Sequence, residues 1–340
     1  MTQAVYPNEL WPKKMTQELF LQGMHGLGDS IFQRAIVRHY MRDFSVYLDN
    51  TWPCIYHDLV AKGLKLVRRE MSPKLRTQAK NYARESHLYV KQPQDLPGKR
   101  VWWTHEGVRK SGFLGAMCEF TGCPVATADY RLPIAPAWRD ATDRLIASWG
   151  AKKPILLYRP LVERTEWAGC VARNPDHRAY SELFNSIRDR FFVVSLADLE
   201  PDKEWIVGNP IKVDIEYHKG ELQIPVLAAL TARAAMVFAS PGFMLILAQA
   251  VGTPSVVTFG GHESSRLYRA AAKYAPFLYI DPIEPCECFS KAHVCKKAID
   301  LPKAKRQLRE FTDAVTESKN YAGRDRLGRS HAPIYESGRA

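Results

Sequence analysis

Residues 234–261, AAMVFASPGFMLILAQAVGTPSVVTFGG, are the clearest indication of fold class in this chain. Its 28 residues include no charged side chain, so its length alone would allow a membrane span. The turns Ser240-Pro241-Gly242 and Gly252-Thr253-Pro254 instead divide it into three short buried elements. We predict a strand, a helix and a strand over residues 236–239, 243–251 and 255–259, which is the repeating unit of a parallel α/β sheet.

The same alternation runs along the rest of the 340 residues. In the first half we expect strands at 18–22, 44–48, 64–67 and 101–104, and helices at 31–42 and 73–84. In the second half we expect strands at 154–158 and 191–195, and helices at 176–190 and 222–233. We therefore predict an α/β protein with two doubly wound, Rossmann-like lobes that face a cleft, over residues 1–150 and 151–300, followed by a last helix at 302–315 and a polar tail within 301–340.

Composition and charge narrow the class of protein and of partner. Hydrophobic residues make up 46% of the chain and charged residues 25%, which is typical of a globular protein and excludes a disordered or fibrous one. Lys and Arg number 48 against 36 Asp and Glu, a net charge of +12. This excess indicates a polyanionic partner, such as nucleic acid, an anionic membrane surface or a phosphorylated substrate, or else simply a basic enzyme.

Much of the positive charge lies in one segment. Residues 62–100 carry eleven Lys and Arg against three acidic residues. We interpret this segment as a docking surface for an anion, with Lys74, Arg76 and Lys80 at its centre. The alternative is a solvated helix face.

Cysteine usage suggests a compartment and a metal. The N-terminus resembles no secretory signal, so we expect a reducing cytoplasm for the seven cysteines. Four candidate ligands for a structural zinc ion fall within ten residues, namely Cys286, Cys288, His293 and Cys295. Their spacing differs from that of common zinc fingers, so free thiols are the alternative.

Three polar turns follow predicted strands, where open α/β sheets place their sites. The first is Gly23-x-x-Gly26-x-Gly28-Asp29, where glycines would let a ligand approach and Asp29 offers a carboxylate, although Asp29 could instead simply cap the helix. The second is Ser240-Pro241-Gly242, whose helix N-terminus would favour a diphosphate. The third is the loop 259–266, which contains His262 and Glu263.

Two of these turns carry a resemblance to a known family. Gly26-Leu27-Gly28-Asp29 and residues 239–260 resemble the N-terminal turn and the donor-binding segment of heptosyltransferase-type glycosyltransferases, glycosyltransferase family nine, which have the GT-B fold. The resemblance implies that Asp29 is the general base and that Ser240, Pro241 and Gly242 hold the nucleotide diphosphate of a sugar donor. It also implies a phosphate-neutralising arginine, for which Arg159, Arg164 and Arg173 are candidates, and a last helix that packs back on the first lobe.

Two departures from the family pattern concern the donor. Family members commonly have an acidic residue at the position of Ser240 and a histidine at that of Leu245, so a nucleotide sugar is expected here but ADP-heptose itself is left open. The chain has no Asp-x-Asp pair, so we expect no catalytic metal.

The acceptor has two candidates, the phosphorylated saccharide of lipopolysaccharide core and DNA with hydroxymethylated bases, as used by virus-encoded sugar transferases. We rank the saccharide slightly ahead. Trp102, Trp103 and His105 could stack on a sugar or a base, or could be ordinary cleft-wall aromatics. We expect a cytoplasmic monomer, in the host if virus-encoded, with peripheral contact to the inner membrane face. The alternatives are a non-catalytic polyanion- or nucleotide-binding module with a decayed site and, less favoured, a nucleotide-sugar epimerase.

Overall fold

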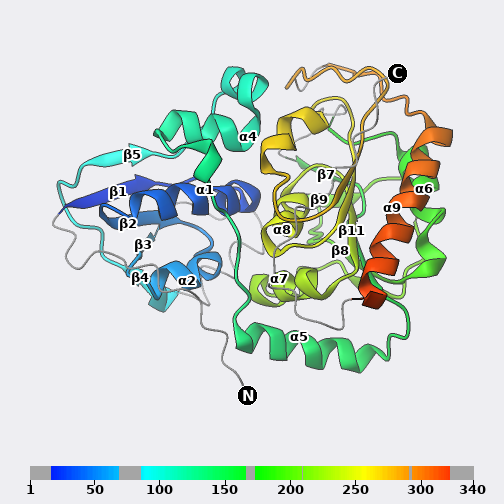
Figure 1. Cartoon of the computed structure of the whole chain (residues 1–340), viewed down its shortest axis with the longest axis horizontal. Coiled ribbons are helices and arrows are strands. Elements are labelled where there is room, and N and C mark those ends of the chain that lie inside the picture. Colours follow the sequence, from blue (N-terminus) through cyan, green and yellow to red (C-terminus); the bar gives the residue numbers. More distant parts are fainter. Residues whose placement is uncertain (1–16, 69–85, 166–172, 209, 291–292, 322–340) are drawn as a thin grey trace.

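Two parallel sheets divide the chain into a first and a second lobe that lie side by side (Figure 1). The computed structural model describes residues 17–68, 86–165, 173–208, 210–290 and 293–321. The predicted fold class, α/β with two Rossmann-like lobes, is confirmed.

The first sheet has the order β4-β3-β2-β1-β5, and all neighbouring strands are parallel. Its strands are β1 Glu18–Gln22, β2 Ser45–Asn50, β3 Lys65–Arg68, β4 Tyr89–Val90 and β5 Gly98–Arg100. The chain moves outward from β1 to β4 and then returns to the other side of β1. The strand order therefore reverses between β1 and β5, and such a reversal opens a crevice at the carboxyl ends of the strands.

The second sheet has the order β10-β8-β6-β11-β12-β13 and is also parallel throughout. Its strands are β6 Ile155–Tyr158, β8 Phe192–Leu196, β10 Ile215–Tyr217, β11 Met236–Ala239, β12 Ser255–Thr258 and β13 Phe277–Ile280. Here the order reverses between β6 and β11. A separate antiparallel pair, β7 Val162–Arg164 and β9 Glu204–Ile206, lies near the carboxyl end of β6.

The charge-free stretch forms the centre of the second lobe. Its strand, helix and strand are β11, α8 Phe243–Val251 and β12, and every residue of both strands is buried. Within the described part of the chain, no helix combines the length and the apolar character that crossing a membrane would require.

Helices cover both faces of the second sheet (Figure 1). Helices α7 Ile224–Arg233 and α8 cover the face toward the first lobe, and α6 His177–Asn185 and α9 Leu301–Tyr321 cover the other. The family resemblance implied that the last helix packs on the first lobe. In the described residues, it packs on the second lobe instead. Its apolar stripe, Ala304, Leu308, Phe311 and Val315, joins the core beneath α6. An amphipathic pattern predicts a buried face but does not identify the surface that covers it.

The helix that crosses between lobes is α5 Pro136–Trp149, which leaves the first lobe and packs on α7. Asp143 forms an ion pair with Arg233 at 2.9 Å, and the Trp149 ring stacks on that of Phe192 with 5.9 Å between centroids. Neither α5 nor α4 His105–Thr121 was predicted from the sequence, and the expected strand at 101–104 is an extended segment after β5. The expected helix at 73–84 lies outside the described residues.

The two lobes share one apolar core. Helix α1 Leu27–Tyr40 packs on α8, and a Cβ atom at Gly28 would lie 2.7 Å from Cδ1 of Ile246. Helix α4 packs on the short helix Ser265–Ala271 of the second lobe. At this contact Gly112 of α4, with a φ of +73°, faces the carbonyl oxygen of Leu267. These contacts hold the carboxyl ends of the two sheets against one another.

Candidate active site

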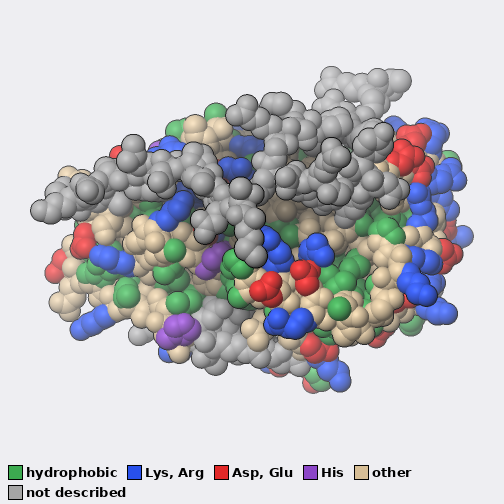
Figure 2. Space-filling model, turned by 60° about the horizontal axis from the view of Figure 1, so that its bottom comes forward, with side chains coloured by type: hydrophobic (Ala, Val, Ile, Leu, Met, Phe, Trp, Pro, Cys, Tyr) green, Lys and Arg blue, Asp and Glu red, His purple; other side chains and the backbone are tan. Residues whose placement is uncertain are grey.

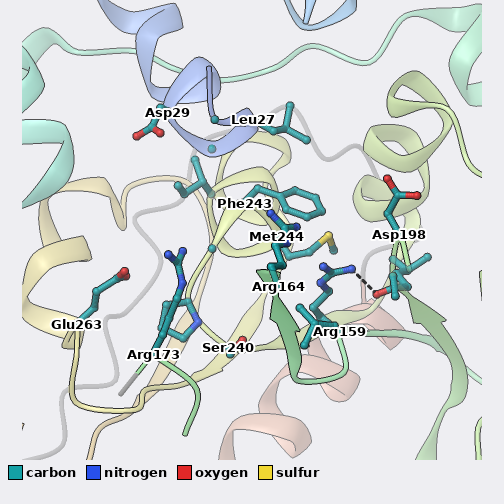
Figure 3. A pocket seen from close by; sticks show the side chains of 18 of the residues that line it. Leu27, Asp29, Arg159, Arg164, Arg173, Asp198, Ser240, Phe243, Met244 and Glu263 are labelled. Atoms are coloured by element: carbon teal, nitrogen blue, oxygen red, sulfur yellow. Dashed lines mark hydrogen bonds between the residues drawn. The ribbon is translucent and has the colours of Figure 1, made fainter. Parts of the chain in front are cut away.

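A cavity of about 760 Å³ lies between the lobes at the carboxyl ends of both sheets (Figure 3). The first lobe contributes the turn after β1 and the segment after β5, the two strands between which its order reverses. The second lobe contributes the turns after β6 and β11, its own point of reversal. The cavity thus lies where two topological switch points face each other, which is the usual position of ligand sites in open α/β sheets.

Asp29 reaches this cavity from the first turn of α1. Gly26 occupies the N-cap position and the helix begins at Leu27, so Asp29 is not the cap of the helix. Trp103, which follows β5, donates a hydrogen bond from Nε1 to Oδ1 of Asp29 at 3.0 Å. A Cβ atom at Gly26 would lie 2.5 Å from Oδ2 of Asp29, so a larger residue there would displace the carboxylate from its position against the turn.

The pKa of Asp29 is raised by burial from 3.8 to about 6. The hydrogen bond from Trp103 and the positive charge of Arg173 lower it, whereas the nearby carboxylate of Glu263 raises it further. At neutral pH the group is ionised and yet more basic than an exposed aspartate. That combination suits a general base.

The second lobe faces Asp29 with the N-terminus of α8. Ser240, Pro241 and Gly242 form the turn into this helix and line the cavity. Gly242 has a φ of +151°, which side chains disfavour, and no side chain of the described residues caps the helix. The first backbone N–H groups of α8 are therefore suited to bind an anion.

The three candidate arginines all line the cavity (Figure 3). Arg159 and Arg164 share the buried carboxylate of Glu204, with N–O distances of 2.7 and 2.8 Å, and Arg159 also donates to the carbonyl oxygen of Leu196 at 2.9 Å. Burial lowers the pKa of Arg159, whereas the nearby charges of Glu204 and Asp198 act to raise it, so carboxylates largely balance these two guanidinium groups. The charge of Arg173 lowers the pKa of both Asp29 and His262, so it acts on the Asp29 side.

The loop after β12 brings His262 and Glu263 to the cavity, as the sequence predicted. Glu263 is 6% exposed and accepts a hydrogen bond from the hydroxyl of Tyr268. Burial lowers the pKa of His262. Figure 3 shows Asp29, Arg173 and Glu263 on one side of the cavity, and Arg159 with Asp198 on the other.

Aromatic rings form the first-lobe wall. Trp103 and His105 line the cavity, whereas Trp102 stacks on Trp103 from behind, with the guanidinium of Arg100 4.0 Å from its ring centroid. The ring of His105 stacks on Phe289 of the second lobe, with 5.0 Å between centroids and 14° between planes. Sequence reasoning did not identify Phe289, because only the fold brings its loop to this wall.

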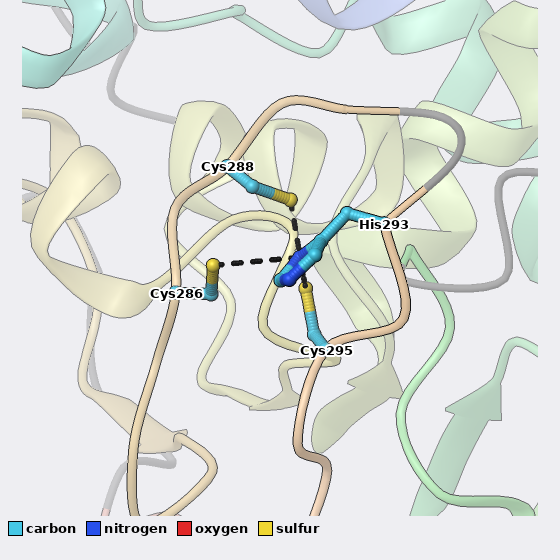
Figure 4. A group of neighbouring side chains, drawn as sticks. All are labelled: Cys286, Cys288, His293 and Cys295. Carbon is cyan, nitrogen blue, oxygen red and sulfur yellow. Dashed lines mark hydrogen bonds between the residues drawn. The ribbon is translucent and has the colours of Figure 1, made fainter.

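Cys286, Cys288, His293 and Cys295 converge next to this wall, and their ligand atoms all lie within 4.8 Å of one another (Figure 4). Nδ1 of His293 lies 3.3 Å from Sγ of Cys295 and 3.6 Å from Sγ of Cys286. Sγ of Cys288 lies 3.5 Å from that of Cys295. The sequence cluster is thus also a spatial one.

The remaining predicted residues fall outside this site or outside the described chain. Lys74, Arg76 and Lys80 are among the residues that are not described. Leu245 is 2% exposed in the core, and the side chains of α8 that line the cavity are Phe243, Met244 and Ile246.

The fold is similar to those of solved glycosyltransferases at low sequence identity. A glycosyl transferase of family 9 from Veillonella parvula is 12% identical with a TM-score of 0.55, over 89% of this chain and 98% of that one. The ADP-heptose lps heptosyltransferase II of E. coli is 11% identical with a TM-score of 0.55, over 89% and 100%. The iron-containing dodecameric glycosyltransferase TibC of enterotoxigenic E. coli is 15% identical with a TM-score of 0.58, over 89% and 77%.

No protein-family model and no curated protein sequence matches the chain. The similarity to these solved structures confirms the predicted likeness to family nine glycosyltransferases at the level of the fold.

Proposed function

We propose that this protein is a glycosyltransferase that moves a sugar from a nucleotide diphosphate sugar to a hydroxyl group of an anionic saccharide. One observation carries the proposal. A buried carboxylate with a raised pKa, Asp29, faces the uncapped N-terminus of α8 and an arginine cluster across a single cavity. This arrangement pairs a base for an attacking hydroxyl with positive groups for a leaving diphosphate.

In this proposal the acceptor hydroxyl oxygen attacks the anomeric carbon of the donor sugar. Its proton passes to the carboxylate of Asp29, and the bond between the anomeric carbon and the diphosphate oxygen breaks. The bonding electrons leave with the diphosphate, whose added charge is stabilised by the N–H groups at 242–244 and by Arg173, with Arg164 nearby. The backbone donors are held before the reaction, so they need little reorganisation.

The donor would lie in the second-lobe half of the cavity. The ring of Phe243 and the side chain of Leu196 offer an apolar surface for a nucleoside, and Arg159 lies 5.8 Å from the centroid of the Phe243 ring. Support for a nucleotide sugar comes from TibC, which has been solved in complex with ADP-D-β-D-heptose, at a TM-score of 0.56 to this chain.

The acceptor would lie against Trp103 and His105, on the Asp29 side. Apolar ring faces and polar tips suit a saccharide. The similarity to a lipopolysaccharide heptosyltransferase of E. coli supports a saccharide of lipopolysaccharide type over DNA. The net charge of +12 favours a phosphorylated acceptor.

The test is mass spectrometry of products from a panel of nucleotide sugars, with phosphorylated glycolipid and hydroxymethylated DNA as acceptors. We expect glycolipid to gain one sugar from one donor, in buffer without added Mg²⁺ or Mn²⁺. Asp29→Asn should lower turnover by about 10²–10⁴-fold with little change in donor affinity. A nucleotide that binds while no acceptor is modified would favour the non-catalytic module, and modified DNA would overturn the saccharide.

A further inference from the structure

The loop between β13 and α9 carries the Cys286–Cys295 cluster and also touches the first lobe. We propose that Cys286, Cys288, His293 and Cys295 bind a zinc ion, and that this ion holds Phe289 against His105 so that zinc loading fixes the first-lobe wall of the cavity. The use of that wall in sugar transfer rests on the proposed function, whereas the zinc site and its link to the first lobe do not.

The distances within the cluster match a tetrahedral zinc site. Zinc binds sulfur at about 2.3 Å and histidine nitrogen at about 2.0–2.1 Å, so tetrahedral ligand atoms lie about 3.6–3.8 Å apart. Three of the six pairs of ligand atoms lie 3.3, 3.5 and 3.6 Å apart, and every pair lies within 4.8 Å, so small side-chain shifts would complete the tetrahedron. Three thiol groups and an imidazole make a closed four-ligand set, which is typical of a structural rather than a catalytic ion.

The backbone is shaped to turn these side chains inward. Glu287 and Phe289, which alternate with the cysteines, have φ values of +53° and +52°, a conformation that non-glycine residues seldom adopt. Gly261 has a φ of +97°, and a Cβ atom there would lie 2.9 Å from Cβ of Cys295. Such unfavourable conformations persist where surrounding contacts hold them in place, and a bound metal ion would do so.

The same loop is bonded to helix α4 of the first lobe. Arg109 of α4 donates from Nη2 to the carbonyl oxygen of Cys288 at 3.1 Å and from Nε to that of Glu287 at 3.4 Å. Its guanidinium lies 5.3 Å from the centroid of the Phe289 ring. Arg266 of the second lobe pairs with Glu287 and donates to the carbonyl oxygen of Arg109 at 2.7 Å. A displacement of Cys288 or Phe289 would therefore disturb the start of α4.

Metal content of the purified full chain tests the site itself. We expect about one zinc ion per chain by elemental mass spectrometry, lost in His293→Ala and retained in His293→Cys, because cysteine restores a fourth ligand. Cys54→Ser, a buried cysteine of the first-lobe core, is the control that should keep its zinc. Iron in place of zinc, no metal, or a disulfide between Cys288 and Cys295 would each overturn the proposal.

Hydrogen exchange tests the link to the first lobe without reference to catalysis. Removal of zinc by a chelator should make amides at the start of α4 exchange about two- to tenfold faster, while α5 stays unchanged. Phe289→Ala should keep its zinc but show the faster amide exchange at the start of α4 even before chelation. Chelation of this variant should then increase the exchange rate in α4 only slightly. Faster exchange confined to residues 284–297 would show that the ion acts only locally. Because neither readout needs a substrate, this result is separable from failure of the proposed function.

Discussion

Asp29 shows how one side chain is given a chemical role by its neighbours. The carboxylate is held by a glycine turn, a tryptophan N–H and the charges of Arg173 and Glu263. Burial opposes its ionisation and raises its pKa to about 6. The same residue in an open turn would be an ordinary helix-terminal aspartate.

The pH dependence of turnover should report this group. The reactive form is the carboxylate, so kcat/KM should rise with pH through about 6 and then level off. Trp103→Phe removes the hydrogen bond that lowers the pKa of Asp29, so the rising limb should move up by about one pH unit. Trp102→Phe, whose ring stacks on Trp103, is the control that should leave the limb in place. An unmoved limb in Trp103→Phe would argue that another group is the base.

The stability of Asp29→Asn should differ from that of the native protein in a pH-dependent way. The pKa of Asp29 is raised on folding, so its protonated form favours the folded state below pH about 4, and that advantage is lost as pH rises through about 6. Asparagine carries no charge, so it does not incur the free-energy cost of burying an ionised carboxylate. Asp29→Asn should therefore be more stable by on the order of 1 kcal/mol at pH 7. The difference should vanish near pH 4 in urea unfolding. A variant that is less stable at pH 7 would contradict the assigned burial cost.

At the scale of elements, α4 depends on one glycine to meet the second lobe. Gly112 has a φ of +73°, and a Cβ atom there would lie 2.5 Å from the carbonyl oxygen of Leu267. Backbone at this distance cannot rotate away as a side chain could. The kink of α4 and the contact between lobes therefore require the same residue.

Substitution of this glycine should cost more than its backbone angle alone explains. Gly150→Ala, at a φ of +62° with open space around it, should destabilise by about 1–2 kcal/mol through the left-handed conformation. Gly112→Ala, at a φ of +73° and a ψ of 173° that only glycine adopts readily, should lose at least as much through its backbone, and a clash adds about 1–3 kcal/mol. Urea unfolding of the two variants measures the difference. Equal losses would show that the contact between α4 and the 265–271 helix is not tightly packed.

At the scale of the whole molecule, positive charge is spread over more than one region. Figure 2 shows Lys and Arg side chains gathered at the end of the molecule where α6 and α9 lie, with acidic side chains among them. Near the first sheet, Lys65 pairs with Glu18 at 3.2 Å and Lys99 donates to the hydroxyl of Tyr40 at 2.8 Å. Net charge alone therefore does not locate an acceptor surface.

Charge reversal in the basic segment 62–100 and, for comparison, on α9 distinguishes a specific acceptor surface from an effect of the overall positive charge. A triple change of Lys74, Arg76 and Lys80 to Glu should weaken binding of a phosphorylated acceptor. It should also flatten the plot of the logarithm of the binding constant against the logarithm of the salt concentration, whose slope is about 0.9 in magnitude for each phosphate contact on duplex DNA. Lys303, Arg306 and Arg309 on α9 changed to Glu alter net charge equally and serve as the control. Equal effects on acceptor affinity at low salt would show that only the overall charge matters.

The layered α/β architecture and the places where turns meet strand ends follow from local patterns in the sequence. Strand β11 and helix α8 have the predicted bounds, because Pro and Gly punctuation and an uncharged buried run are local signals. The cluster Cys286 to Cys295 was likewise visible as a spacing. Helix α4 was missed because the positive-φ Gly112 interrupts its pattern, and that kink has meaning only against the second lobe.

Which of these local features act together depends on contacts between segments that are distant in the sequence. The tertiary structure brings Trp103 to Asp29, pairs Arg159 and Arg164 with Glu204, and places Phe289 against His105. Helix α9 lies on the second lobe and not, as expected, on the first, because its single apolar face does not specify which surface it covers. The physical reason is that contacts between distant segments depend on strand order and on the surfaces that remain uncovered, and neither is encoded in the period or spacing of a single segment.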